Sequence, residues 1–526
     1  MSSTLGTFWR SFRQVALFAA VVFSLAPSLC AKSVQFLTTL TFDSGAPCGN
    51  AVTVADVNGD GIPDAILAGG CPDYNGQGLP GTISVQLGKG DGTFRPAVVY
   101  DSGGVQALSV QVADVNGDGK LDVLVANECD NDACFNSVVG LLLGNGDGTF
   151  QPAIAIDYSV AVCQAGWPAS LAVADVNGDG KPDLVVGYSR CVAILLGSGG
   201  GTFQPPVTYF SSSVVDAVAV SDVNHDGKLD LAVAYECSDG LCADGGVGVL
   251  LGNGDGTFQT ASIYDSNGYI ATSVQVADVN GDGNPDILAL NAAQSLHSNL
   301  TGSVGVLLGN GDGTFQPAGA YNSGDPYPSS LAVGDINGDG KPDLAIAHCS
   351  AAFNHGAACP GTIGVVGVLL GNGDGTFQAT HKSPSGGVAA NAIAIADMNG
   401  DRKPDLVVAN RLGEGDGDGT LGVLLQYNVR LHTTAVSLSS SVNPSHQGQP
   451  VTFTAVVSSA QGMVPDGEVV TFFDGEFEIS TGTTASGVVS FTTATLAAKK
   501  HVIRATYFGD AKFKPSTKTL KQIVSK

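Results

Sequence analysis

One nine-residue pattern recurs seven times along the chain and constrains the fold more than any other feature. It first occurs as Asp56-Val-Asn58-Gly-Asp60-Gly-Ile-Pro-Asp64, with carboxylates at positions 1, 5 and 9 and an asparagine at position 3. In a loop of this spacing the side-chain oxygens turn inward. With a backbone carbonyl at position 7, they suit Ca²⁺, which accepts six to eight oxygen ligands. The pattern therefore predicts a calcium-binding loop in a repeated scaffold.

The predicted ligands are the side chains at positions 1, 3, 5 and 9 of each copy. They are Asp56, Asn58, Asp60, Asp64, Asp114, Asn116, Asp118, Asp122, Asp175, Asn177, Asp179, Asp183, Asp222, Asn224, Asp226, Asp230, Asp278, Asn280, Asp282, Asp286, Asp335, Asn337, Asp339, Asp343, Asp397, Asn399, Asp401 and Asp405. Solvated turns without metal are the less favoured interpretation. Three carboxylates without a cation would repel one another by about 1 kcal/mol per pair.

The calcium is expected to be structural, with an extracellular-type dissociation constant on the order of 10⁻⁴–10⁻³ M. The seventh site is doubtful because Arg402 replaces the glycine at position 6. A side chain at that position is strained if φ is positive, and the guanidinium adds a cation beside the ligands. We therefore expect up to seven sites, with the last weak or empty.

The segments between the loops predict β-strands. They are short runs rich in Val, Leu, Ile and Ala, bounded by Gly, Asn and Asp, without a sustained helical period. The repeats are about 57 residues long, and the first six also hold a Leu-Gly-Asn-Gly-Asp-Gly-Thr-Phe element or a close variant of it, which is typical of a hairpin connection. Its phenylalanine is expected in the core, at Phe94, Phe150, Phe203, Phe258, Phe315 and Phe377. Four antiparallel strands repeated seven times predict an all-β chain with a seven-bladed β-propeller.

The two ends of the repeat region are complementary. Residues 34–45 resemble the fourth strand of a unit, whereas the seventh unit stops after its third strand at residues 421–427. We therefore expect the first strand to complete the last unit, leaving no open sheet edge between the ends. The acidic loops should lie at one end of the strands. The cysteines and the long insertions should lie at the other, at residues 69–80, 127–137, 235–246, 291–303 and 348–362.

The formal charge of −25 is uneven, and most of it follows from the loops. Residues 32–429 hold 12 basic and 42 acidic side chains, whereas residues 430–526 hold 9 and 6. This acidity disfavours nucleic acid as a partner, because phosphates would be repelled. Arg10 and Arg13 precede an apolar run at residues 15–25 and small residues ending near Ala31, which predicts a signal peptide at residues 1–31. Cys30 leaves lipid attachment as a less favoured alternative.

Removal of the signal would leave ten cysteines, an even number that suits disulfides in an oxidising compartment. Proximity in the sequence suggests five pairs, although sequence alone does not fix connectivity. They are Cys48 with Cys71, Cys129 with Cys134, Cys163 with Cys191, Cys237 with Cys242, and Cys349 with Cys359. No later apolar run is long enough to cross a membrane. We therefore expect a secreted or cell-surface protein without a membrane span.

Two resemblances sharpen these expectations. The acidic loops and Leu-Gly-Asn-Gly-Asp-Gly-Thr-Phe-Gln hairpins of residues 32–429 resemble the FG-GAP/VCBS repeats of exported bacterial proteins, which are similar to the integrin α-subunit propeller. This resemblance implies a seven-bladed propeller with calcium between the first two strands of each blade. Residues 430–526 resemble a bacterial Ig-like domain, through Gly448-Gln-Pro-Val-Thr-Phe-Thr-Ala and Gly467-Glu-Val-Val-Thr-Phe-Phe-Asp-Gly. They predict a β-sandwich.

Other candidate sites carry weaker signals. His348, Cys349, His355 and Cys359 could gather Zn²⁺, although a disulfide between the two cysteines is favoured. Aromatic residues near the insertions could stack on sugar rings, although local packing is favoured for each; they are Tyr74, Phe135, Trp167, Tyr235, Tyr269, Tyr327 and Phe353. The acidic run at residues 414–418 lacks the ligand spacing and is interpreted as a solvated loop.

The leading functional hypothesis is an exported binding or adhesion module for a glycan or protein ligand, with the Ig-like domain as spacer or second binding surface. No catalytic constellation is recognisable, so an enzyme is not expected. One alternative is a polysaccharide-processing enzyme of the lyase type, which would need a central pocket lined by His, Arg, Lys or Tyr. Arg190 and Arg411 are its only candidates. The other alternative is a structural envelope protein.

Overall fold

The structure is a computed structural model of the 526-residue chain. It describes residues 34–71, 80–129, 137–157, 168–188, 190–211, 213–237, 244–293, 301–348, 363–412, 419–426, 433–459, 464, 466–475, 477–509 and 513–526. The described residues are all β-structure, as predicted, with strands β1 to β36 and no helix. None of them therefore forms an apolar helix that could span a membrane.

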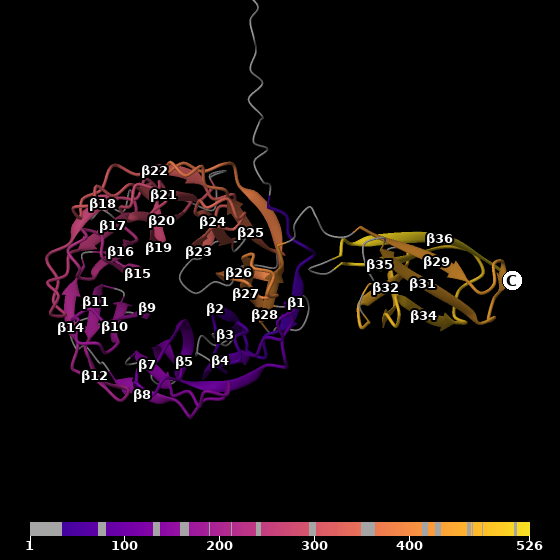
Figure 1. The fold of residues 1–526 in the computed structure, drawn as a ribbon, viewed down its shortest axis with the longest axis horizontal. Coiled ribbons are helices and arrows are strands. Elements are labelled where there is room, and N and C mark those ends of the chain that lie inside the picture. The colour runs from indigo at the N-terminus through magenta and orange to yellow at the C-terminus, as the bar shows by residue number, and fades with distance from the viewer. Residues whose placement is uncertain are drawn as a thin grey trace, which may run out of the picture. The chain divides into compact units, whose positions relative to one another are not determined.

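The repeat region forms seven units of antiparallel strands, arranged around a common centre in Figure 1. The first five units contain β2 (Gly49–Ala55), β3 (Asp64–Gly69), β4 (Pro80–Gln86), β5 (Val98–Ala113), β6 (Asp122–Cys129), β7 (Val138–Leu142), β8 (Ile154–Asp157), β9 (Pro168–Ala174), β10 (Asp183–Tyr188), β11 (Cys191–Leu195), β12 (Gly197–Gly199), β13 (Thr202–Phe203), β14 (Val207–Phe210), β15 (Val215–Ser221), β16 (Asp230–Tyr235), β17 (Gly246–Leu250), β18 (Ser262–Asp265), β19 (Ile270–Ala277), β20 (Asp286–Ala292), β21 (Ser303–Leu307) and β22 (Gly319–Asn322).

The last two units contain β23 (Pro328–Gly334), β24 (Asp343–His348), β25 (Ile363–Leu369), β26 (His381–Ala396), β27 (Asp405–Leu412), β28 (Thr420–Leu424) and β1 (Leu40–Asp43). As predicted, β1 is the fourth strand of the seventh unit and pairs with β28, with Leu40 opposite Val423. Strands β5 and β26 are longer than one unit requires. Each is the fourth strand of one unit and continues as the first strand of the next, with a register shift on the way.

The strand order explains the burial pattern. In Figure 1 the first strands, such as β9, β15 and β19, lie innermost, and the fourth strands, such as β14, β18 and β22, lie outermost. The second strands lie between them, and β3, β10, β16 and β24 are buried at every residue. Their continuous apolar sequence matches this position, because both faces contact neighbouring units.

The hairpin phenylalanines join neighbouring units. Their predicted place in the core is confirmed for Phe94, Phe150, Phe258, Phe315 and Phe377, whereas Phe203 is half-buried and packs against the core. Phe150 of the second unit is 7% exposed and meets Tyr100 of the first unit edge to face, with ring centroids 5.7 Å apart. The same pairing joins Tyr209 to Phe258 and Phe42 to Phe94. Aromatic pairs prefer this edge-to-face geometry. The aromatic contact therefore recurs at the border between consecutive units.

The C-terminal domain is a two-sheet sandwich with a core of its own. Its strands are β29 (Thr434–Ser440), β30 (Ser445–His446), β31 (Val451–Ser459), β32 (Val469–Asp474), β33 (Phe477–Thr483), β34 (Val488–Thr493), β35 (Lys500–Tyr507) and β36 (Ser516–Ser525). One sheet has the order β29-β31-β34 and the other β30-β36-β35-β32-β33. Phe453, Phe472 and Tyr507 are fully buried between them. Apolar residues alternate along these strands, as expected for a sheet with one buried face.

One predicted disulfide is confirmed in full. Cys48 and Cys71 are bonded, with Cα atoms 5.5 Å apart. Cys129, Cys191 and Cys237 are also disulfide-bonded, and their predicted partners lie outside the described residues. Cys349 and Cys359 both lie outside them too, as do most residues of the five insertions and the acidic run at 414–418.

Candidate metal centres

The first acidic loop is held in shape by its own side chains. Asp56 accepts hydrogen bonds from the backbone N–H groups of Gly59 and Gly61 at 2.8 and 2.7 Å. Asn58 Oδ1 accepts one from Asp60 N at 2.8 Å, and Asp60 Oδ1 accepts one from the residue at position 7. Short polar side chains that bond the backbone two to five residues onward stabilise such turns. The oxygen-bearing residues therefore also set the loop conformation.

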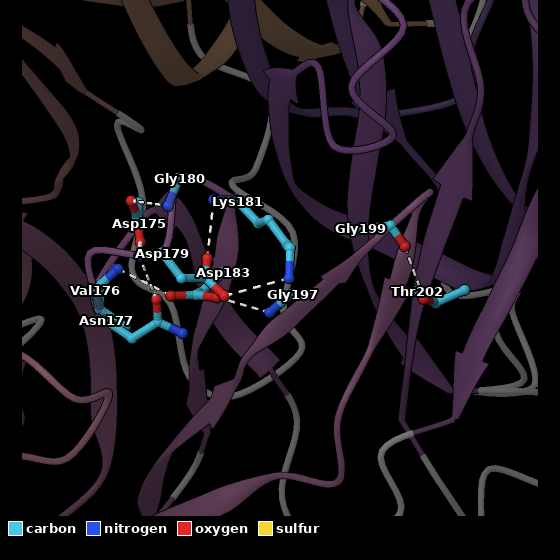
Figure 2. A network of polar contacts seen from close by, with 10 residues as sticks. All are labelled: Asp175, Val176, Asn177, Asp179, Gly180, Lys181, Asp183, Gly197, Gly199 and Thr202. Atoms are coloured by element: carbon cyan, nitrogen blue, oxygen red, sulfur yellow. Dashed lines mark hydrogen bonds and ion pairs between the residues drawn. The ribbon is translucent and has the colours of Figure 1, made fainter.

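The same arrangement recurs in the other copies. The carboxylate at position 1 accepts the N–H of position 6 in every loop, at 2.7 to 2.9 Å. Figure 2 shows the third loop, in which the side chains of Asp175, Asn177 and Asp179 lie around one short turn, with Asp183 beside it. The seven loops are therefore copies in structure as well as in sequence.

The carboxylate at position 9 has a role that the sequence did not reveal. Asp64 is fully buried and begins β3; its Oδ2 accepts Val57 N at 3.0 Å and its Oδ1 accepts Gly88 N at 2.8 Å. In the third loop Asp183 bonds Val176 N and Gly197 N in the same way (Figure 2). This side chain therefore fastens the acidic loop to the hairpin that follows the third strand of the same unit.

The position-9 carboxylates lie in an unfavourable electrostatic environment. The pKa of Asp64 is raised to about 6, mainly by burial and also by the nearby carboxylates of Asp60 and Asp56, against two backbone hydrogen bonds that lower it. Burial likewise raises the pKa of Asp343 to about 6 and that of Asp405 to about 7. A divalent cation near these groups would offset both the desolvation and the mutual repulsion.

The donor chemistry fits Ca²⁺, because each loop offers three carboxylates and one amide oxygen, all hard ligands. Within the described part of the chain, however, no three His, Cys, Asp or Glu side chains are gathered as a metal site. The loop carboxylates instead accept backbone N–H groups. The loops thus carry a suitable ligand set, whose carboxylates are engaged by the backbone.

The fourth and seventh loops depart from the others. Arg402, at position 6 of the seventh loop, has φ of 63°, and His225, at position 4 of the fourth, has φ of 60°. Glycine occupies these positions in the other loops with similar positive φ. Lys403 Nζ also lies 2.8 Å from Asp401 Oδ2 in a partly buried ion pair, which is shorter than the equivalent pairs of the third and fourth loops, at 3.4 and 3.7 Å. A protein ammonium therefore already contacts one predicted ligand of the seventh site.

Several of the loops also contact the next unit. Gly201, in the hairpin of the third unit, donates its N–H to the carbonyl of Val115 in the second loop at 3.2 Å. Gly375 and Gly92 make the equivalent bonds to Val279 and to Met398 of the preceding loops. A side chain at Gly148 would contact Asn58 and Leu87 of the preceding unit, so the positive φ of 83° and the close approach both favour glycine. The acidic loops therefore lie at the borders between units.

The remaining candidates from the sequence, for zinc binding and for sugar stacking, differ in burial, and several lie outside the described residues. His348 is fully buried at the end of β24, whereas Cys349, His355 and Cys359 lie outside the described residues. Tyr235 is 5% exposed and belongs to the core. Tyr269 and Tyr327 are half-buried, and Tyr74, Phe135, Trp167 and Phe353 are not described.

A cavity of about 300 Å³ lies between the first strands of the second to fifth units. Its wall contains Ser109, Ser170, Ser273, Gln111 and Gln275, together with aliphatic residues. None of its lining residues is His, Arg, Lys or Tyr. Arg190 and Arg411 do not line it; the former is exposed and the latter is buried. The cavity offers hydroxyl and amide groups but no acid, base or charged group for catalysis.

One buried polar pair was missed by the sequence reasoning. Ser102 Oγ donates to Asn127 Oδ1, and Asn127 Nδ2 donates to the Ser102 carbonyl at 3.1 Å. The fifth and seventh units repeat this pair with Ser266–Asn291 and Ser385–Asn410. The separation is 25 residues in all three units, a signal that was present in the sequence.

Comparisons with known proteins agree with this architecture. The FG-GAP-like repeat family matches residues 56–125, 129–186, 222–289, 295–346 and 357–408, and the bacterial Ig-like domain (group 3) matches residues 438–525. Among characterised proteins, the chain is 30% identical over 156 residues to phosphatidylinositol-glycan-specific phospholipase D of Bos taurus and 31% over 159 residues to that of Homo sapiens. These matches cover 26% and 27% of this chain and only 18% of each relative.

Solved structures that the chain matches include an Agrocybe aegerita lectin that recognises non-reducing terminal N-acetylglucosamine, with a TM-score of 0.43, 21% identity and coverage of 66% of this chain and 90% of the lectin. They also include BBS1N in complex with ARL6DN, with a TM-score of 0.43, 11% identity and coverage of 74% and 96%. The family matches span more than half of the chain. The chain therefore belongs to the FG-GAP-like repeat family and carries a C-terminal bacterial Ig-like domain of group 3.

Proposed function

We propose that the chain is an exported binding module in which calcium stabilises a propeller that presents ligand-binding loops. The observation that carries this proposal is the repetition of one polar network in seven loops, each with three carboxylates and an asparagine. These side chains also set the loop conformation, but neutral side chains could accept the same backbone hydrogen bonds, whereas three carboxylates in one short loop repel one another unless a cation is present. Repeated oxygen ligands of this kind are typical of structural calcium sites.

In the first unit, Asp56, Asn58, Asp60 and Asp64 would hold the ion. Calcium would supply positive charge where burial and neighbouring carboxylates raise the pKa of Asp64. The hydrogen bond from Gly88 to Asp64 connects this site to the hairpin of its own unit. The close approach of Gly148 to Asn58 brings the hairpin of the next unit against it. Binding would therefore stiffen the border between two units as well as the loop.

The ligand surface is proposed at the strand ends opposite the acidic loops. That end carries the disulfide between Cys48 and Cys71, which pins the start of the first insertion, and the insertions differ in length and sequence. Variable loops on a rigid scaffold commonly carry binding function. The proposed ligand is a glycan or a protein outside the cell.

An enzymatic function receives less support. The central cavity has no His, Arg, Lys or Tyr in its wall, which the lyase-like alternative requires. The match to the phospholipases covers too little of either chain to bring their activity to this protein. A binding module therefore explains the chain with fewer assumptions than an enzyme does.

Melting with calcium and with a chelator tests the metal. At about 5 mM Ca²⁺, a site with a dissociation constant of about 0.1–1 mM adds about 1–2 kcal/mol by mass action. We expect a higher midpoint with calcium, and a smaller calcium shift in the Asp118→Asn variant. Asp147→Asn, which removes an exposed hairpin carboxylate outside the ligand set, is the matched control and should keep the full shift. Equal midpoints in calcium and chelator would refute structural calcium.

A screen of glycans and cell surfaces, run with and without calcium, tests the binding role. We expect retention of the chain by a defined glycan or surface protein, weakened by chelation. Failure to bind while the calcium-dependent melting shift persists would leave the metal role intact and refute the binding role.

A further inference from the structure

The sixth acidic loop, between β23 and β24, differs from the others at its asparagine. In the other six loops, Oδ1 of the asparagine at position 3 accepts the backbone N–H of position 5, as Asn177 does from Asp179 at 2.8 Å in Figure 2. In the sixth loop, Asn337 Oδ1 is buried without a hydrogen-bond partner, and the residue is only 8% exposed. A buried acceptor without a donor costs free energy unless a cation reaches it. The sixth loop therefore holds one predicted ligand oxygen that no described group of the protein satisfies.

A local change in the backbone hydrogen bonds accompanies this difference. In the other six loops, the carboxylate at position 9 accepts the N–H of position 2. In the sixth loop, Asp343 Oδ2 accepts Asn337 N at 3.1 Å instead, and Ile336 N donates to the carbonyl of Gly334 at 2.9 Å. The bond from position 5 to the carboxylate at position 1 is kept, at 2.9 Å. The carboxylates therefore keep their bonds to the loop backbone, while the amide oxygen of Asn337 has none.

The lysine of the sixth loop also lies away from the ligands. In the third, fourth and seventh loops, the lysine at position 7 places Nζ 3.4, 3.7 and 2.8 Å from Oδ2 of the carboxylate at position 5. Lys341 Nζ instead donates to the carbonyl of Asn372 at 2.6 Å, in the hairpin of its own unit. Among the described residues, no ion pair involves Asp339, which is position 5 of the sixth loop. A metal cation would therefore not have to displace an ammonium from this carboxylate.

The border beside the sixth loop is also built differently. In the first five loops, the valine at position 2 packs in one apolar cluster with the hairpin phenylalanine of the next unit. The seventh unit has no such hairpin, and Ile336 of the sixth loop shares its cluster with Val34 and Phe36. Phe36 also pairs with Gln426, just after β28. Residues 34–36, here called the N-terminal segment, therefore take the place of the missing hairpin beside the sixth loop.

We propose that calcium fills the sixth loop before the others and that its binding there fastens the N-terminal segment to the border between the sixth and seventh units. This inference rests on the proposed structural role of calcium and adds which site takes the ion first. Binding would satisfy Asn337 Oδ1 and so remove the cost of a buried acceptor without a partner. We expect the sixth loop to bind Ca²⁺ about tenfold more tightly than the third, with a dissociation constant on the order of 10⁻⁵–10⁻⁴ M. The seventh loop, with Arg402 and Lys403, should bind least.

The coupling to the N-terminal segment acts in both directions. Ile336 precedes Asn337 in the chain, so contacts that hold Ile336 also restrain the turn that carries the unpaired oxygen. If the ion favours the docked segment, then the docked segment must favour the ion by the same factor. Loss of the contacts made by Val34 or Phe36 should therefore weaken calcium binding at the sixth loop.

Calorimetric titration of the full metal-free chain with Ca²⁺ tests the order of filling. We expect a single tight site, about tenfold tighter than the rest. Asp339→Asn should remove it, whereas Asp374→Asn, which removes an exposed hairpin carboxylate of the same unit, is the matched control and should keep it. Asn337→Ala should weaken the tight site about tenfold without lowering the melting midpoint in chelator, because no hydrogen bond to its oxygen is lost. Asn177→Ala removes the bond to Asp179 N, so it should lower that midpoint and spare the tight site.

The same titration tests the coupling. Phe36→Ala should weaken the tight site severalfold and leave the weaker sites unchanged. Leu37→Ala is the matched control, because Leu37 is also buried but packs in the cluster of the first and seventh units. A tight site that Phe36→Ala leaves unchanged would overturn the coupling, and seven equal sites, or a tight site that survives Asp339→Asn, would overturn the order of filling. Both outcomes would leave structural calcium intact, whereas a chain that binds no calcium would refute that role and this inference together.

Discussion

Replacement of His348 by asparagine should remove an acid-induced loss of stability from the sixth unit. His348 is fully buried at the end of β24, and neither ring nitrogen has a hydrogen-bond partner. Asparagine occupies this position in the second, fifth and seventh units, where it pairs with a serine 25 residues earlier. The sixth unit retains the matching serine, Ser323, which is also fully buried. Asparagine at position 348 would therefore find the partner that it has elsewhere.

The pKa of His348 sets the expected change in folding stability. Burial lowers the pKa of His348 to about 4, against the opposing attraction of Asp325, whereas the unfolded chain has the ordinary value near 6.5. Above about pH 6.5 the ring is neutral in both states and nothing is lost. As the pH falls toward 4, the unfolded state binds a proton that the folded state resists, so stability decreases. The difference of about 2.5 pKa units corresponds to about 3 kcal/mol at full effect.

Urea unfolding at saturating calcium, followed by circular dichroism at several values between about pH 7.5 and pH 4, measures this loss. The carboxylates titrate in both proteins, so the difference between His348→Asn and wild type isolates the histidine. That difference should grow in favour of the variant by about 3 kcal/mol over this range. Asparagine in place of the exposed His381 is the matched control and should leave the pH profile unchanged. A difference that stays constant within about 0.5 kcal/mol would refute the reasoning.

Three further substitutions test other parts of the structure. Arg402→Gly should stabilise the seventh loop by about 0.5–1 kcal/mol in urea unfolding, because φ of 63° suits glycine, and a loss of stability would contradict this. Phe150→Ala should cost about 3–5 kcal/mol by removing a buried ring and its contact with Tyr100, and a loss below about 1 kcal/mol would be inconsistent with that contact. The pKa of Asp216 is raised, first by burial and then by the nearby carboxylate of Glu236. Its Oδ2 atom is buried without a hydrogen-bond partner. Wild type should therefore lose stability as the pH rises above about 4, whereas the Asp216→Asn variant should not. Parallel profiles of stability against pH for the two proteins would exclude this effect.

The fold was predictable because the chain repeats its signals in register. The acidic loop, the hairpin glycines and the phenylalanine after them each recur at the same place in successive units, so each copy supports the others. Residues 40–43 could be assigned to the seventh unit because that unit lacks a fourth strand. The continuity of β5 and β26 was not predictable, because the glycines at Gly103 and Gly386 suggest a turn there. The ladder instead passes through them with a register shift.

The candidate site was predictable in composition but only partly in arrangement. A ligand pattern specifies which side chains are available, whereas their partners depend on tertiary contacts with residues some twenty positions away, such as Asp64 with Gly88. Since the position-9 carboxylate binds backbone N–H groups on two segments, substitution there would disturb the loop, the hairpin and the proposed ion together. Substitution at position 5 is different, because Asp60 and Asp118 accept backbone bonds only within their own loop. A calcium effect is therefore measured more cleanly at Asp118 than at Asp122, where loss of the metal and loss of the fold could not be separated.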